Sequence, residues 1–157
     1  MTNNIDSDIW VEDFLMDLLE RTGLDVSIEE LSIDENDVIC IQLSGPDSAR
    51  VIGREGQTLE AFQHILVSSA IHNRVGNRRI LLDVENYRER REQRILDEAN
   101  RLADEALDTG DAQDVSPMSP RERRLVHMVV SEIDGLTTES VGEGDERYVR
   151  IIPEGRE

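Results

Sequence analysis

The chain has no lysine, a single cysteine, only two Tyr, two Phe and one Trp, and no long apolar run. A lone cysteine, Cys40, excludes an internal disulfide, and the cysteine and histidine spacings fit no zinc site. Cys40 lies in an apolar stretch, so we expect a small core residue there. No stretch approaches membrane-spanning length, and the opening MTNNIDSDIW lacks the basic and apolar regions of a signal peptide. These absences predict a cytoplasmic protein with no membrane insertion, metal site or cofactor.

All 17 basic residues are arginine, whose planar guanidinium suits phosphate and carboxylate groups. The formal net charge is −18, so the surface as a whole repels nucleic acids and anionic membranes. The charge is unevenly distributed, because residues 1–49 carry −12 whereas residues 50–94 carry +3 and residues 119–131 carry +2. The two positive windows are candidate contacts for a polyanion. Random clustering on an acidic chain is the alternative interpretation.

The first half of the chain predicts the order helix, strand, strand, helix, glycine loop, helix, strand. Apolar residues at helical spacing indicate a helix over about 8–22, and two β-rich runs joined by DEND (34–37) indicate a hairpin. Pro46 favours a first helical turn capped by Ser44 or Gly45. A second helix, capped by Thr58, is expected to bury a stripe composed of Leu59, Phe62, Ile65, Leu66, Ser69 and Ala70. The run RRILLDVE supplies the third strand.

The second half predicts a long helix from about Asn86, a second helix and a final hairpin. The long helix is expected to bury Ile95, Ala99, Leu102, Ala103 and Ala106. Ser119-Pro120-Arg121-Glu122 is a strong helix start, because serine caps, proline takes the first turn and glutamate closes a capping box. That helix is expected to stop at Gly135. We therefore expect an α+β protein of two small αβ units joined by a long helix.

The segment Gly53-Arg54-Glu55-Gly56 separates the two predicted helices of the first unit. Glycines let the main chain approach a partner closely, because no Cβ intervenes. The following helix points its N-terminal amides, with their partial positive charge, toward the loop. Both features suit a phosphate, and Arg54 and Arg50 add cations, whereas Glu55 opposes one. A plain structural turn is an equally good interpretation of the loop alone. If the glycines carry little of the core, Gly53→Asp with Gly56→Asp should weaken binding while the fold survives.

The order of elements around this loop changes that balance, since residues 8–85 resemble a type II KH domain. In that family a GxxG loop clamps the sugar-phosphate backbone of about four unpaired nucleotides. The matching positions are Gly53, Arg54, Glu55 and Gly56, with Arg50 and Gln57 beside them as further candidate contacts. The resemblance implies that bases lie between the second helix and the adjoining strand.

The second candidate site is on the helix that begins after Ser119. Arg123 and His127 are four residues apart, on one helical face, where a shared anion would make the pair favourable. His127 can donate a hydrogen bond even when neutral. A solvated arginine beside a half-buried histidine is the simpler interpretation of the spacing. Arg124 is a further candidate phosphate contact.

In context, residues 86–153 resemble the R-three-H domain, a family named for this Arg/His pair that binds single-stranded nucleic acid. A KH domain followed by an R-three-H domain is the arrangement of the bacterial Jag family, also called SpoIIIJ-associated or KhpB. Longer members carry an additional N-terminal domain, which this sequence does not contain, so roles tied to it are not expected here. Residues 1–7 and 154–157 are expected to be disordered.

The resemblance implies a non-catalytic binder of single-stranded RNA, or of single-stranded DNA, acting as a bacterial post-transcriptional regulator of cell-envelope or cell-division functions. The alternative is an adaptor that pairs with a small KH-domain protein, with nucleic-acid binding secondary. Enzymatic activity is not expected, because His64 and His72 lie far from His127 in the sequence and no carboxylate pair, nucleophile elbow or P-loop accompanies them. The sequence leaves the oligomeric state open.

Overall fold

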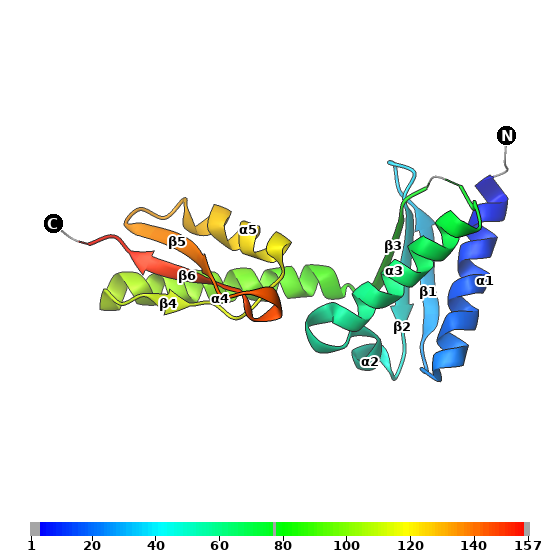
Figure 1. Ribbon diagram of the computed structural model, residues 1–157, viewed down its shortest axis with the longest axis horizontal. Coiled ribbons are helices and arrows are strands. Elements are labelled where there is room, and N and C mark those ends of the chain that lie inside the picture. The colour runs from blue at the N-terminus through cyan, green and yellow to red at the C-terminus, as the bar shows by residue number, and fades with distance from the viewer. Residues whose placement is uncertain (1–3, 77, 156–157) are drawn as a thin grey trace. The chain divides into compact units, whose positions relative to one another are not determined.

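A computed structural model of the chain describes residues 4–76 and 78–155 (Figure 1). The chain divides into two compact units, one ending at Tyr87 and the next beginning at Arg88; the predicted boundary lay between residues 85 and 86. The fold is of the predicted α+β class.

The first unit has the predicted order of elements. They are α1 (Asn4–Thr22), β1 (Ser27–Ile33), β2 (Ile39–Ser44), α2 (Ser48–Ile52), the 3₁₀ helix η1 (Arg54–Gly56), α3 (Gln57–His72) and β3 (Ile80–Val84). Because α1 begins at Asn4, residues 4–7 are helical, and the prediction of disorder was wrong for them. Residues 1–3 lie outside the described residues.

The three strands form a sheet in the order β1-β2-β3, with β1 antiparallel and β3 parallel to the central β2. Burial alternates along β2, where Ile39, Ile41 and Leu43 are buried and the residues between them are half-buried. Only one face of the sheet is therefore covered. Cys40 is on the other face and is only half-buried, so its predicted place in the core was wrong. Partial burial still raises the pKa of the Cys40 thiol.

The helices α1 and α3 cross the covered face of this sheet (Figure 1). From α1, Val11, Leu15 and Leu19 enter the core at helical spacing. From α3, the buried stripe is Leu59, Phe62, Leu66 and Ala70, which confirms the core position of Phe62. Ile65 was predicted to belong to that stripe but is 43% exposed. Its position, three residues after Phe62 and one before Leu66, turns it toward the edge of the stripe.

The caps of the short helices differ from the prediction. The N-cap of α2 is Asp47, so Pro46 precedes the cap and neither Ser44 nor Gly45 occupies it. The Asp47 carboxylate instead accepts a hydrogen bond from the main-chain N–H of Asp25 at 2.8 Å. This bond, with that to Arg50, lowers the pKa of Asp47. The Asp47 side chain thus ties α2 to the turn before β1.

The second unit comprises α4 (Tyr87–Thr109), β4 (Gln113–Asp114), α5 (Pro120–Val130), β5 (Leu136–Val141), the 3₁₀ helix η2 (Gly144–Glu146) and β6 (Tyr148–Pro153). The strands pair in the order β4-β6-β5, and both pairings are antiparallel. The predicted buried face of α4 is confirmed, and it meets Val126 and Val130 of α5 and Val149 and Ile151 of β6 in one cluster. Helix α5 ends at Val130, five residues before the predicted stop at Gly135. Residues 154–155 have no regular structure, and 156–157 lie outside the described residues.

Candidate nucleic-acid interface

The GxxG loop is a single tight turn between α2 and α3. Gly53 ends α2, donating its N–H to the carbonyl of Ala49 at 3.0 Å, and has φ 71°. Glu55 (φ 52°) and Gly56 (φ 84°) are also left-handed. Gly56 occupies the N-cap position of α3, so the predicted cap, Thr58, was wrong. Because glycine has no side chain, it leaves the first amides of α3 without a side-chain cap.

Both glycines are required by neighbours within the protein. A Cβ on Gly53 would lie 2.0 Å from Oγ1 of Thr58, and a Cβ on Gly56 would lie 2.8 Å from a ring carbon of Tyr87. Gly56 is itself buried. The premise that these glycines carry little of the core was therefore wrong, and replacing both with aspartate is expected to lower stability as well as any binding. The exposed middle residues of the loop are the ones to change in an experiment.

Those middle residues, Arg54 and Glu55, are exposed, as is the neighbouring Gln57. Arg50 is exposed as well, and its guanidinium pairs with Asp47 at 3.2 Å. Arg50 is the more exposed partner, and a pair of this kind near the surface contributes little to stability. The six residues predicted to form this site, from Arg50 to Gln57, thus lie along one continuous turn. Three of their side chains are solvent-facing cations or amides, and one is a carboxylate.

The strand beside α3 presents an outer edge, because among the described residues β3 pairs only with β2. The side-chain amide of Gln63 occupies that edge. Its Nε2 donates to the carbonyl of Ile80 at 2.5 Å, and its Oε1 accepts from the N–H of Leu82 at 2.6 Å. A base that reads these two main-chain groups would have to displace Gln63. Sequence reasoning missed this role, since a glutamine on a helix gives no local signal of a partner 17 and 19 residues away.

The second candidate site is built on the first turn of α5, which is fixed by a capping box as predicted. The Ser119 hydroxyl accepts from the N–H of Glu122, and Glu122 Oε2 accepts from the N–H of Ser119 at 2.8 Å. The other carboxylate oxygen pairs with Nε of Arg91 on α4 at 3.1 Å. Both carboxylate oxygens are thus engaged, and the start of α5 is held to α4. The contribution of Arg91 was not predicted.

His127 holds α5 against strand β5. Its Nδ1 lies 2.7 Å from the Thr138 hydroxyl and its Nε2 lies 2.9 Å from the Ser140 hydroxyl. Burial, and secondarily the positive charge of Arg123, lowers the pKa of His127. A neutral ring has one donor and one acceptor nitrogen, and a hydroxyl can satisfy either. His127 is therefore a positioning residue, and its predicted hydrogen bond to an anion would require one of these two bonds to break.

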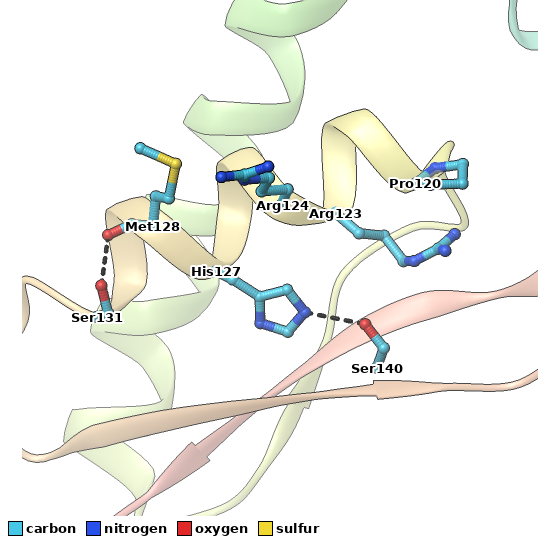
Figure 2. A pocket seen from close by; sticks show the side chains of 7 residues that line it. All are labelled: Pro120, Arg123, Arg124, His127, Met128, Ser131 and Ser140. Atoms are coloured by element: carbon cyan, nitrogen blue, oxygen red, sulfur yellow. Dashed lines mark hydrogen bonds between the residues drawn. The ribbon is translucent and has the colours of Figure 1, made fainter.

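Arg123 and Arg124 border an open hollow of about 440 Å³ on the same unit. The hollow is lined by Pro120, Arg123, Arg124, His127, Met128, Ser131 and Ser140, which Figure 2 shows. Arg123 is half-buried and donates to the carbonyl of Met118 at 2.9 Å. Across residues 4–76 and 78–155, neither arginine forms an ion pair with a carboxylate. Both cations are thus available to an external anion.

The structure thus brings Arg123, Arg124 and His127 together, with His127 in a supporting position. Ser140, Thr138 and Met128 were missed by sequence reasoning. Strand β5 gives no motif to mark its hydroxyls, and their meeting with α5 is set by the fold of the β5–β6 hairpin. An exposed methionine at helical spacing is, by itself, indistinguishable from a core residue.

Two kinds of site are absent from the described part of the chain. No group of three or more histidine, cysteine, aspartate or glutamate side chains there is arranged to hold a metal ion. Nor does any described helix combine the length and apolar character needed to cross a membrane.

Comparisons with known proteins agree with both halves of this description. The KH domain of the KhpA/KhpB family matches residues 10–84, and the R-three-H domain matches residues 93–153. Both are binding families without catalytic activity, in agreement with the prediction that the chain is not an enzyme. The fold and the two sites therefore define a protein of the class that joins a type II KH domain to an R-three-H domain.

Relatives place the chain more narrowly. It is 33% identical over 130 residues to the RNA-binding protein KhpB of Clostridium symbiosum, and 31% identical over 130 residues to that of Bacillus subtilis. These alignments cover 82% and 81% of this chain, and 57% and 60% of the relatives. The KhpB of Streptococcus pneumoniae is 32% identical over 117 residues, which are 74% of this chain and 35% of that protein. The chain belongs to the Jag/KhpB family and spans only part of the length of these relatives.

Proposed function

We propose that the chain is a non-catalytic binder of single-stranded RNA that acts in the bacterial cytoplasm as a post-transcriptional regulator related to cell-envelope or cell-division control. The observation that carries the proposal is the hollow beside Arg123 and Arg124. In a chain of net charge −18, ion pairing with the abundant carboxylates is the expected fate of an arginine. Two neighbouring arginines that have no such pair within the described part of the chain, at an open hollow, suit the phosphates of a polynucleotide. The names of the relatives support RNA as that polynucleotide.

The GxxG loop supports a second phosphate contact. The exposed main chain at Arg54 and Glu55 precedes α3, whose first amides carry partial positive charge. Arg54 adds a full positive charge, and Glu55 reduces its effect. A strand that contacts both units gains affinity by tethering, because the second contact forms within one complex.

We expect recognition to be led by phosphates, with weak selectivity for base sequence. The main-chain pair of Ile80 and Leu82, which lies where the KH resemblance places bases, is already hydrogen-bonded to Gln63. The binding free energy that a base gains at that edge is only the difference between its own hydrogen bonds and those of the Gln63 side chain, which it must replace. A net gain of zero to about 1 kcal/mol is small against typical base discrimination of about 1–3 kcal/mol per position.

Replacing Arg124 tests the proposal. Arg124 is exposed and has no ion pair among the described residues, so Arg124→Gln should leave the stability unchanged. The affinity for an unstructured RNA oligonucleotide, measured by fluorescence anisotropy at low salt, should fall by roughly tenfold for one lost charged contact. The matched control is Arg101→Gln on α4, which removes the same charge from a residue that lines neither hollow of this unit. If the two variants lost RNA affinity equally, the loss would reflect the change in net charge, and a local binding site at Arg124 would be refuted.

An adaptor function is the second candidate, and one observation favours it. The helices α1 and α3 expose large apolar side chains, namely Ile9, Met16, Ile65 and Ile71. Exposed apolar side chains are common at protein interfaces, and a small KH-domain protein is the partner that the family resemblance implies. Affinity purification with and without nuclease separates the two functions. Partners retained after nuclease treatment favour the adaptor, whereas partners lost with the RNA favour the RNA-binding function.

A further inference from the structure

Arg124 and Met128 form a ridge on α5 between two hollows. They are four residues apart and therefore lie on one helical face. Both border the hollow of about 440 Å³ described above. Both also border a second hollow of about 200 Å³, lined by Glu92, Arg121, Glu122, Arg124, Leu125 and Met128. Figure 2 shows their side chains on the side of α5 that faces away from Ser140.

Met128 is an unusual residue for this position. The other apolar side chains of α5 are buried or half-buried, whereas Met128 is 58% exposed. In the described part of the second unit, the other exposed large apolar residue is Leu107 on α4, at 36%. A single exposed methionine beside arginines is too small an apolar patch for a protein interface, which needs a contiguous one. The thioether is polarizable and flexible, and it packs well against flat aromatic rings.

The positive charges near Met128 indicate which kind of aromatic ligand the ridge would bind. Arg121, Arg123 and Arg124 lie within the first turn and a half of α5, and the net charge of the chain is −18. The partner of this ridge is therefore expected to carry negative charge next to its aromatic ring, as a nucleotide does. A guanidinium can stack on a base while its edge donates to phosphate.

Aromatic side chains do not supply this contact at the two hollows. Phe62 and Tyr87 are buried in the first unit, and Trp10 and Phe14 stack on each other in α1 at 4.9 Å between ring centres. Tyr148 lies against Arg150, at 5.8 Å. None of these five lines either hollow. The imidazole of His127 borders the larger hollow but not the smaller one, and both of its nitrogens are hydrogen-bonded to hydroxyls of β5. On the ridge between the hollows, stacking must therefore come from the guanidinium and the thioether.

We propose that Arg124 and Met128 form a stacking platform for one nucleobase of the bound single strand, while Arg123 binds an adjoining phosphate. This inference rests on the proposed RNA-binding function and adds a base contact to it. The platform accepts any base, since every base offers a flat face. Met128 is thus a binding residue of the R-three-H unit in addition to the arginine that gives the family its name.

The test compares two strands of equal length, an oligouridylate and a strand of abasic ribose-phosphate units. Met128→Ala should weaken binding to oligouridylate by about fivefold, at the lower end of the range for a stacked base. It should leave binding to the abasic strand and the salt dependence unchanged, because methionine carries no charge. Arg124→Gln should weaken binding to both strands. Met16→Ala on α1, another exposed methionine, is the matched control and should change neither affinity.

The outcomes distinguish a failure of RNA binding from a failure of the stacking platform. Wild-type protein that binds neither strand refutes the RNA-binding function itself. Wild-type protein that binds both, with Met128→Ala changing neither affinity or both equally, leaves the phosphate sites standing and overturns the stacking platform. Because Met128 is exposed and alanine favours helix, the variant is expected to fold.

Discussion

The hydrogen bonds of His127 make a prediction about stability. In His127→Ala, the hydroxyls of Thr138 and Ser140 lose their common partner, and α5 loses its side-chain link to β5. Each of the two bonds contributes about 0.5–1.5 kcal/mol, so the free energy of unfolding should fall by about 1–3 kcal/mol. In a unit of this size, the lower bound corresponds to a decrease in Tm of about 4 °C or more. Urea titration and thermal melts, monitored by circular dichroism, measure both quantities.

The pH dependence of the same variant distinguishes this account from a general loss of packing. The pKa of His127 is lower in the folded protein than its usual value of about 6.5, because the ring is partly buried and close to Arg123. Below about pH 6.5, the unfolded chain therefore binds more protons at this residue than the folded one. The contribution of His127 is complete above that pH and declines as the pH falls through this window. His127→Ala should remove this part of the pH dependence.

The control for the stability measurement is His72→Ala, which alters an exposed histidine at the end of α3. It should change the stability by no more than about 0.5 kcal/mol. If His127→Ala were as stable as the wild type, the two hydroxyl contacts would have no structural role. If the wild type became more stable as the pH fell from 7 to 5, in a manner abolished by His127→Ala, the direction assigned to its pKa would be refuted.

Two further predictions concern the first unit. Gly56→Ala should lower the free energy of unfolding by about 1–3 kcal/mol, because its Cβ would meet the Tyr87 ring and its φ of 84° is unfavourable for alanine. Urea titration measures this change. A stability within error of the wild type would contradict the packing described for the loop. Gln63→Leu should free the carbonyl of Ile80 and the N–H of Leu82, exposing a strand edge that favours self-association. Sedimentation velocity should then show concentration-dependent oligomers, and a monodisperse variant identical to the wild type would rule out this protective role.

The sequence was most informative where hydrogen bonds are local. The capping box of Ser119 and Glu122 joins residues three apart, and its residue types alone predict it. The amphipathic face of α4 follows in the same way from the spacing of its apolar residues. The element order around the GxxG loop then led to the KH resemblance, which the comparisons confirm.

The contacts that define how the sites work join residues distant in the sequence. Gln63 meets β3, Arg91 meets Glu122 across 31 positions, and Gly56 lies under Tyr87. No periodicity or short motif encodes such pairs, because they depend on how whole elements pack. For the same reason the glycines were interpreted as an opening for a ligand, although neighbours within the protein already require them. The N-cap of α2 was also misplaced, because Ser44 or Gly45 was expected there and Asp47 occupies it, with its carboxylate bonded to the distant N–H of Asp25.

The dependence of RNA affinity on salt concentration shows most directly whether the arginines of the two sites bind phosphates. If Arg54, Arg123 and Arg124 each neutralise one phosphate of a single strand, the slope of log affinity against log salt should be about −2, from roughly 0.7 per contact. Arg124→Gln should reduce its magnitude by about 0.7, and Arg101→Gln should leave it unchanged. An affinity that stays constant across the salt series, or a slope that Arg101→Gln and Arg124→Gln lower equally, would show that these arginines do not bind the phosphates.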